Sequence, residues 1–246
     1  MTKFNVEETF NPEEYLYFYR NMLTFERTQK EIDFLVKHTQ LNYPLEILDL
    51  ACGHGRHSNL LAHLGHSVTG IDVTEGFLKL AQKEAVKLHV RVNYHQQDMR
   101  DLNYENSFDR VYALYTAIGY FDDPQNEKVF RNIYAALKPG GMFCFDSHNR
   151  DTYLTYAVPS SITEIEGNFM IDEHSFDTLT GLNTTRRTVL YKGAKKTFNF
   201  SVRFYNPTEL SALFKAIGFS NITFYENWEG KQISQNCKRM IVTTQK

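Results

Sequence analysis

The sequence predicts an α/β fold, in which helices cover both faces of a parallel β-sheet and a β-rich segment is inserted late in the chain. Three observations predict it. Between residues 45 and 150, short apolar runs typical of strands alternate with amphipathic runs typical of helices. A turn with glycine at alternate positions follows the first of these strands. Residues 160–205 then lose the helical pattern and show extended segments separated by turns.

Length and charge limit the classes of protein to consider. The chain has 246 residues, of which 42% are hydrophobic, which fits one sizeable domain or one domain with an insertion. Its 27 basic and 29 acidic residues give a formal net charge of −2. We therefore expect no broad electrostatic attraction to nucleic acid or to an anionic membrane.

The cysteines and the first residues indicate a cytoplasmic protein. Cys52, Cys144 and Cys237 form a sparse, odd-numbered set without a CxxC pair, which favours a reducing compartment. The first eight residues contain no apolar stretch of the kind that a signal peptide requires. No apolar run approaches the roughly 18 residues that span a bilayer. We expect a soluble, cytoplasmic protein without a membrane segment.

Residues 12–40 are predicted to be helical. Asn11 is a suitable N-cap, Pro12 suits the first helical position, and two acidic residues follow. Ile32 and Leu35 give the later part of this segment an apolar face.

The early part of the same segment is rich in aromatic residues, and two interpretations of them stay open. The helix covers something flat or cationic, or it simply packs on the domain as an amphipathic helix. The aromatic cluster consists of Tyr15, Tyr17, Phe18 and Tyr19.

Strands and helices alternate through the middle of the chain. We expect strands over residues 45–50, 66–71, 90–97, 108–114 and 142–146, and helices over residues 56–64, 74–88 and 124–137. Thr74 is the expected cap of the second helix. The residues that this helix is expected to bury are Phe77, Leu80, Ala81 and Leu88. The Lys-Pro-Gly-Gly run at residues 138–141 indicates a firm turn. This βαβα order predicts a parallel sheet with helices on both faces.

Two turns divide the β-rich segment. The turns at residues 177–181 and 192–194 join three extended runs, which predicts an antiparallel meander. A capping sequence at residues 206–209, Asn-Pro-Thr-Glu, then opens a helix that Gly218 closes. Final strands are expected over residues 221–225 and 239–244.

The turn after the first strand is suited to a nucleoside cofactor. Residues 47–58 pass from an apolar strand that contains Asp49, through Gly53 and Gly55, into a helix. Glycine lets a ligand approach the backbone, and the free N–H groups at the helix start face that ligand.

Three further positions fall in register with this turn. Asp72 ends the second strand, where a carboxylate can accept hydrogen bonds from both hydroxyls of a ribose. Asp98 ends the third strand, where it can accept one from an adenine amino group, with Met99 against the ring. Leu114 and Tyr115 follow the fourth strand. In an open α/β sheet, all these places lie on the edge where ligands bind.

These motifs resemble those of class I S-adenosylmethionine-dependent methyltransferases. The matching segments are residues 48–55, 70–72, 97–99, 108–111 and 137–141. The resemblance is strong over residues 44–150 and looser over residues 200–245. Residues 117–121 and the β-rich insertion resemble a bacterial branch whose members are often described only as small-molecule or uncharacterised methyltransferases. One departure is Ala51, where many members have glycine.

The resemblance implies a Rossmann-like fold, with a seven-stranded, mostly parallel sheet whose last strand is antiparallel. It implies three parts. Residues 1–43 would form an N-terminal helical cap, residues 44–150 and 206–246 the S-adenosylmethionine-binding domain, and residues 151–205 a β-rich insertion or lid.

The resemblance also implies roles for individual residues. The backbone around residues 51–55 holds the methionine part of S-adenosyl-L-methionine, and Asp49 orients that end. Asp72 takes the ribose, Asp98 and Met99 the adenine, and Leu114 and Tyr115 face the substrate. The cofactor-binding residues expected are Asp49, Ala51, Cys52, Gly53, His54, Gly55, Asp72, Val73, Asp98, Met99, Leu114 and Tyr115.

Other chemistries are disfavoured. A nicotinamide dehydrogenase would have glycine or alanine where this chain has Ser58. The histidine pairs near residues 54–57 and 63–66 lack a cysteine or acid to complete a metal site, so we expect no metal. Cys52 has no evident partner base and is expected to pack. No nucleophile elbow of a serine hydrolase occurs.

Methyl transfer leaves no obligatory catalytic residue, because the sulfonium donor is already activated. His148 and Tyr115 are candidates for a base or a substrate contact. Aromatic rings that could line a pocket for the cationic sulfur are those of Tyr15, Tyr19, Tyr115 and Tyr120.

The acceptor is expected to be a small molecule. Nucleic-acid amino methyltransferases of this fold have an Asn/Asp-Pro-Pro-aromatic run after the fourth strand, whereas residues 114–117 are Leu-Tyr-Thr-Ala. Methylation of RNA or protein is the leading enzymatic alternative, and a non-catalytic S-adenosylmethionine-binding protein is another. The chain is expected to be a monomer or a homodimer.

Overall fold

A seven-stranded sheet organises residues 6–246, the part of the chain that the computed structural model describes; residues 1–5 of the predicted N-terminal cap lie outside it. The strand order is β10-β11-β5-β4-β1-β2-β3. Its strands are β1 (Glu46–Leu50), β2 (Ser67–Asp72), β3 (Val92–Gln96), β4 (Phe108–Ala113), β5 (Leu137–His148), β10 (Ser220–Tyr225) and β11 (Arg239–Gln245). Strand β11 runs antiparallel to both neighbours, and the other pairings in this sheet are parallel. The predicted fold class is therefore confirmed.

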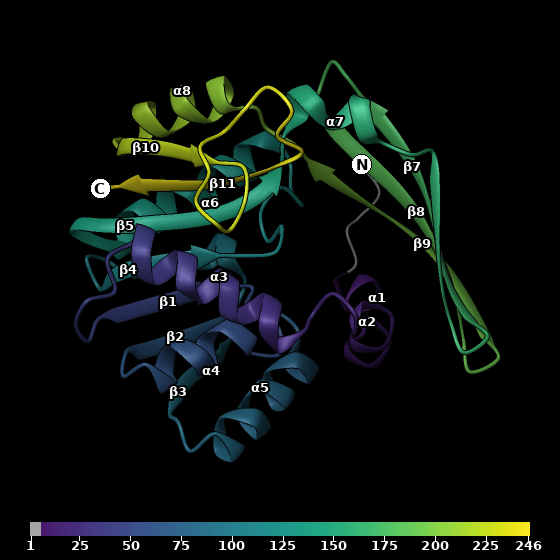
Figure 1. Cartoon of the computed structure of the whole chain (residues 1–246), viewed down its shortest axis with the longest axis horizontal. Helices are drawn as coiled ribbons and strands as arrows, with labels where there is room; N and C mark the ends of the chain where they lie inside the picture. The colour runs from purple at the N-terminus through teal and green to yellow at the C-terminus, as the bar shows by residue number, and fades with distance from the viewer. Residues whose placement is uncertain (1–5) are drawn as a thin grey trace.

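Helices cover both faces of this sheet (Figure 1). Helices α3 (Phe25–His38) and α4 (Arg56–His63) pack on one face, and α5 (Glu75–Lys87) lies beside α4 against β2 and β3. Helices α6 (Asp123–Ala136) and α8 (Pro207–Ile217) pack on the other. The capping box of Asn206 and Glu209 opens α8, and Gly218 closes it with a φ of 119°, as the sequence predicts.

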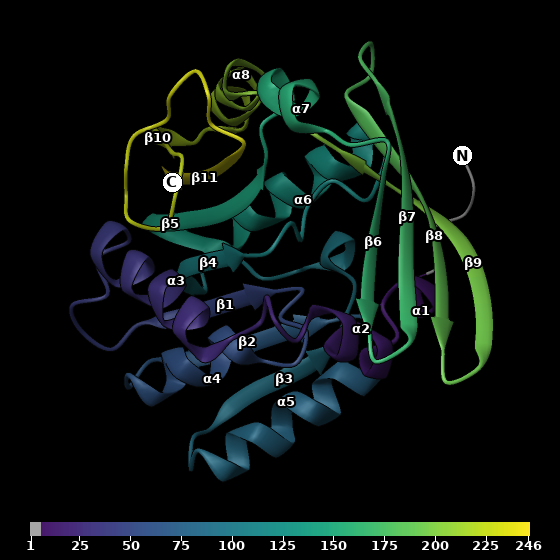
Figure 2. The ribbon, with the colours of Figure 1, turned by 45° about the vertical axis from the view of Figure 1, so that its right-hand side comes forward.

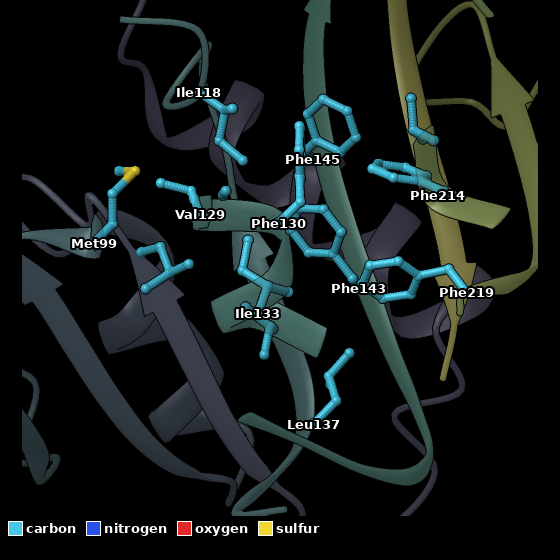
Figure 3. Close-up of a cluster of buried hydrophobic side chains, with 14 of the residues drawn as sticks. Met99, Ile118, Val129, Phe130, Ile133, Leu137, Phe143, Phe145, Phe214 and Phe219 are labelled. Atoms are coloured by element: carbon cyan, nitrogen blue, oxygen red, sulfur yellow. The ribbon is translucent and has the colours of Figure 1, made fainter. Parts of the chain in front are cut away.

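The larger apolar cluster lies between the sheet and helices α6 and α8 (Figure 3). Along β5, Phe143 and Phe145 belong to this cluster, whereas Cys144 between them belongs to the cluster on the α3 face. Phe130 of α6 packs edge-on against Phe214 of α8, with ring centroids 5.0 Å apart. Burial of each such side chain stabilises the fold by about 1.5–3 kcal/mol. This core fixes the strands whose ends carry the predicted site.

The β-rich segment forms a separate sheet beside the main body (Figure 2). Its four strands are β6 (Ser160–Ile165), β7 (Asn168–Asp177), β8 (Leu182–Tyr191) and β9 (Ala194–Arg203). They pair in sequence order and antiparallel, which confirms the meander but corrects its three runs to four. The missed turn is Glu166-Gly167, where both residues have positive φ, at 51° and 77°. Helix α7 (Arg150–Tyr156), just before this sheet, was also not predicted.

The N-terminal helical segment is interrupted, which corrects the single helix expected over residues 12–40. The observed helices are α1 (Val6–Thr9), α2 (Pro12–Tyr19) and α3. Asn11 caps α2 as predicted, accepting from the Glu14 N–H at 3.2 Å. Thr24 caps α3 in the same way, accepting from the Arg27 N–H at 3.2 Å. A second capping residue explains why a new helix begins there.

Helix α2 is attached to the four-stranded sheet. Phe18 packs in one cluster with residues of β6 to β9. The Tyr17 hydroxyl donates to the backbone oxygen of Ile165 at 2.8 Å, and the Lys192 ammonium pairs with Glu13 at 2.5 Å. Figures 1 and 2 show α1 and α2 lying between this sheet and the main body. The N-terminal segment and the insertion thus meet in space.

Two local expectations are wrong. Helix α5 buries Leu78 and Ala85 but leaves Leu80 and Leu88 37% and 36% exposed. Thr74 occupies its N-cap position without a side-chain capping bond. The run at residues 138–141 belongs to the start of β5 rather than to a free turn. Two backbone hydrogen bonds to Lys246 hold this run in the sheet. The Gly140 N–H donates to the Lys246 oxygen at 3.0 Å, and the Lys246 N–H donates to the Gly141 oxygen at 2.9 Å.

A candidate cofactor cavity at the ends of the parallel strands

A cavity lies at the carboxyl ends of β1, β2 and β4, with α1 and α2 above it. Its volume is about 140 Å³. The predicted cofactor residues that line it are Asp49, Ala51, Cys52, Gly53, His54, Asp72, Val73, Asp98, Met99, Leu114 and Tyr115. Gly55 is not among the lining residues. Positions scattered over residues 49–115 are therefore brought to one place.

The glycine turn has the left-handed backbone that its sequence requires. Ala51, Gly53 and Gly55 have φ values of 52°, 55° and 76°. A Cβ on Gly53 would meet nothing within 4 Å, so only its backbone conformation favours glycine. A Cβ on Gly55 would lie 2.7 Å from the Cβ of Ala81 and would also collide with Tyr94. Gly55 therefore lets α4 start close against α5 and β3.

The Asp72 carboxylate is held by two backbone donors. Its Oδ2 accepts from the Gly53 N–H at 2.9 Å and its Oδ1 from the Thr74 N–H at 2.8 Å. Burial raises the pKa of Asp72, and these hydrogen bonds oppose the rise. Each oxygen keeps a further acceptor position, so the pair can receive the two hydroxyls of a ribose.

Asp49 and Cys52 lie deeper in the site. Asp49 is 1% exposed and accepts a 2.5 Å hydrogen bond from the Ser58 hydroxyl. Burial raises its pKa, against the effect of His57 and the Ser58 bond. Burial and the neighbouring carboxylates raise the pKa of the Cys52 thiol well above its usual value. A thiol in that state is a poor nucleophile, which agrees with a packing role.

Asp98 has a partner that the sequence did not reveal. Arg100 donates to it from its backbone N–H at 2.8 Å and from Nη2 at 2.6 Å. Burial raises the pKa of Asp98, but the Arg100 bonds outweigh it and the net shift is downward. The Arg100 guanidinium also lies 4.3 Å from the ring centroid of Phe121. The carboxylate therefore stays ionised and shares its acceptor positions with any adenine.

A buried charge network adjoins the cavity, and the sequence analysis missed it. Glu31 of α3 is 1% exposed and accepts from Arg27 Nε at 3.1 Å, from Arg56 Nη1, and from His57 Nε2 at 2.8 Å. Burial raises the pKa of Glu31, but His57 and Arg56 have the larger, opposite effect and lower this pKa to about 2. Arg56 and His57 line the cavity. The available signal was a charged residue beside Ile32 on an otherwise apolar helix face.

Aromatic side chains form part of the cavity wall. Tyr15, Tyr115 and Tyr120 line the cavity, whereas Tyr19 does not and instead accepts from Arg187 at 2.9 Å. Tyr15 packs edge-on against Phe77 with centroids 5.4 Å apart. Burial raises the pKa of all three lining tyrosines, so they remain neutral phenols.

The backbone after β4 is strained. Tyr115 and Thr116 have φ values of 66° and 59°, which side chains other than glycine rarely adopt. The Tyr115 N–H donates to the buried Asp146 carboxylate at 2.5 Å, which holds this conformation. Such strain is concentrated at functional sites. With this backbone conformation, Tyr115 lines the cavity.

His148, a predicted candidate base, lies outside the cavity lining. Its Nδ1 is 2.9 Å from the Tyr156 hydroxyl. Burial, followed by Arg239, lowers its pKa to about 3. Among residues 6–246, no group of three or more histidine, cysteine or acidic side chains is arranged to hold a metal ion. No helix in this described part is long and apolar enough to cross a membrane.

Comparison with known sequences identifies the central segment. Residues 47–141 match the family described as "Methyltransferase domain". YqeM of Bacillus subtilis (strain 168) is 37% identical over 105 residues, which are 42% of this chain and 42% of that protein. A ubiquinone biosynthesis O-methyltransferase of Coxiella burnetii is 31% identical over 105 residues, or 43% and 44% of the two chains. These matches thus span less than half of the relatives' length.

Comparison with solved structures covers nearly the whole chain. An S-adenosylmethionine-dependent methyltransferase from Clostridium acetobutylicum aligns over 98% of this chain and 99% of its own, with a TM-score of 0.78 and 19% identity. The sugar N-methyltransferase KedS8 from Streptoalloteichus aligns over 92% and 90%, with a TM-score of 0.66 and 18% identity. Residues 47–141 therefore match a methyltransferase domain, and the chain as a whole has the fold of S-adenosylmethionine-dependent methyltransferases.

Proposed function

We propose that the chain binds S-adenosyl-L-methionine in this cavity and transfers its methyl group to a small molecule. One observation carries the proposal. The cavity joins the glycine turn after β1, the acid at the end of β2, the acid after β3 and the residues after β4, which are the places where a nucleoside cofactor is bound in an open α/β sheet.

Each part of the cofactor has a candidate partner. Asp72 would accept from the ribose hydroxyls, and Asp98 from the adenine amino group, with Met99 against the ring. The backbone of residues 51–55 would carry the methionine part. The apolar lining that surrounds these groups suits the bound adenine and excludes water.

The reaction needs alignment more than it needs a base. The sulfonium supplies an activated methyl group, so placing the acceptor atom behind that methyl in line with the C–S bond provides much of the rate. The cavity tyrosines are neutral phenols whose faces can receive a cationic sulfur. An acceptor that carries a proton would release that proton to water after the methyl transfer, so the reaction does not require a base from the protein.

Two features favour a small-molecule acceptor. The cavity is roofed by α1 and α2 and walled by aromatic rings, which leaves room for a compact molecule. Structural neighbours include a sugar N-methyltransferase and an amino pentose methyltransferase. The three free, buried cysteines suit a cytoplasmic enzyme.

A binding assay followed by a transfer screen tests the proposal. Calorimetry should detect S-adenosylmethionine binding to the full chain, and Asp72→Ala should weaken it strongly. Label from a radioactive methyl donor should then appear in a fraction of a metabolite pool and not in RNA. Absence of binding would exclude the proposal. Binding without transfer to any fraction would instead favour a non-catalytic cofactor-binding protein.

A further inference from the structure

One charged group at the cavity keeps a buried donor without a partner. Arg56 occupies the first position of α4, and its side chain is 10% exposed. Its Nη1 donates to Glu31 and, at 2.9 Å, to the Thr28 hydroxyl. Its Nη2 is buried and makes no hydrogen bond within the described part of the chain. Leaving such a donor unpaired costs free energy, so it points to a ligand that supplies an acceptor.

The surroundings of Arg56 favour a negatively charged ligand. Helix α4 begins at the N-cap Gly55, which has no side chain to satisfy the first N–H groups of the helix. The positive end of the helix dipole therefore faces the same side of the cavity as the guanidinium.

The guanidinium groups of Arg56 and of two other arginines lie close to the ring of Tyr115. The Cζ atoms of Arg27, Arg56 and Arg239 lie 5.1, 5.4 and 5.9 Å from the ring centroid of Tyr115. Three carboxylates face them. Asp146 pairs with Arg239, Asp49 interacts electrostatically with Arg56 and His57, and Glu31 is shared by Arg27, Arg56 and His57. Glu31 is not among the cavity-lining residues, so it holds Arg56 from outside the cavity.

We propose that Arg56 binds a carboxylate inside the cavity and that Glu31, which lies outside the matched domain, is its positioning residue. The inference rests on the proposed function, because the carboxylate belongs either to the amino-acid end of the cofactor or to the methyl acceptor. A planar guanidinium matches a carboxylate better than an ammonium does. Helix α3 thereby takes part in ligand recognition through a side chain that never touches the ligand.

A pair of ligands that differ only in the carboxylate tests whether the amino-acid end of the cofactor supplies the carboxylate that Arg56 binds. The probes are S-adenosylhomocysteine and S-adenosylthiopropylamine, the same molecule without its carboxylate, titrated calorimetrically into the full chain. Arg56→Met should weaken binding of the first about 10- to 100-fold and of the second less than about twofold. Arg131→Met, at an exposed arginine of α6 that pairs with Glu127, is the matched control and should change neither affinity.

A second pair of probes tests the acceptor as the source. Benzoate and methyl benzoate are titrated into the chain saturated with S-adenosylhomocysteine. If the acceptor supplies the carboxylate, Arg56→Met leaves both nucleoside affinities unchanged and removes the preference for benzoate over its ester. An equal loss for both members of each pair, or no loss for any probe, overturns the proposal.

Two further variants separate recognition from folding. Arg56→Lys keeps the charge but not the planar group, and should lose part of the carboxylate preference at an unchanged melting temperature. Glu31→Gln should reduce the same preference several-fold, whereas a purely structural role would weaken both members of a pair alike. If the wild-type chain binds no nucleoside, the proposed function fails, while the benzoate pair titrated into the chain alone still tests Arg56.

Discussion

The carboxylate of Asp72, at the end of β2, accepts a hydrogen bond of 2.9 Å from the backbone N–H of Gly53, in the turn after β1. The group that we propose for the ribose therefore also fixes the loop that would carry the methionine part. Its second oxygen holds the Thr74 N–H at the start of α5. One side chain thus links two neighbouring βα turns, and with them the sites that we propose for the ribose and for the methionine part.

We predict that Asp72→Asn weakens S-adenosylhomocysteine binding by about 10-fold or more, because the amide has one acceptor oxygen where the carboxylate has two. Calorimetry measures the change. Asp33→Asn, on the exposed face of α3, is the control and should have no effect. An affinity within about twofold of wild type for Asp72→Asn would show that the ribose is bound elsewhere.

Two glycines with the same backbone angle separate strain from crowding. Gly55 and Gly167 have φ values of 76° and 77°, but a Cβ on Gly167 would meet nothing within 4 Å. Gly167→Ala should lower the free energy of unfolding by about 1–2 kcal/mol, from backbone strain alone. Gly55→Ala should lower it by roughly 1–3 kcal/mol more, because Ala81 and Tyr94 must move. Urea unfolding measures both, and equal losses would contradict the crowding at Gly55.

Adjacent ion pairs across β7 and β8 should differ in strength. Arg187 and Asp172 are buried and paired at 2.7 Å, whereas Arg186 and Glu173 form an exposed pair at 2.6 Å. Asp172→Asn should destabilise the chain by about 3–5 kcal/mol, because it leaves a buried guanidinium without its counter-charge. Glu173→Gln should cost less than about 1 kcal/mol. Chemical unfolding curves of the two variants provide the comparison, and similar losses would rule out this assignment.

Glu31 should make the stability depend on pH in the acid range. Its pKa falls from 4.5 to about 2 on folding, so the stabilisation is complete above pH 4.5 and is lost as the pH falls toward 2. The shift corresponds to about 3 kcal/mol. Glu31→Gln should therefore flatten the stability curve between these limits. Urea unfolding from pH 5.5 downward checks it, with the exposed Glu127→Gln as control; an unchanged slope in Glu31→Gln would contradict the pKa shift.

Local sequence signals predicted the elements that position the site. The capping box of Asn206, the left-handed turn at Gly53 and Gly55, and the strand that ends at Asp72 all depend on a few consecutive residues. The register of acids at successive strand ends then followed from the parallel sheet, because parallel strands end on the same edge.

Contacts between distant segments could not be predicted in the same way. Glu31 lies 25 residues before Arg56, and only the packing of α3 against α4 brings them together. Leu80 looked apolar enough for burial, but the buried face of α5 is formed by Phe77, Leu78, Ala81 and Ala85, and Leu80 lies outside it. Arg100 is close to Asp98 in sequence, yet whether its side chain turns back depends on the short helix η1 (Met99–Asp101), which contains Arg100 and has Asp98 as its N-cap.

The attachment of α2 to the four-stranded sheet has a consequence for biosynthesis. Tyr17 and Ile165 are 148 residues apart, and Glu13 and Lys192 are 179 apart. As the chain leaves the ribosome, α2 emerges early, but its partner strands are among the later parts to be made. The matched segment at residues 47–141, which supplies most of the cavity lining, is made before these partner strands, so α2 gains its contacts with the four-stranded sheet only after the insertion has emerged. Contacts of such long sequence separation form slowly, so ligand-binding competence should be the last property that the nascent chain acquires.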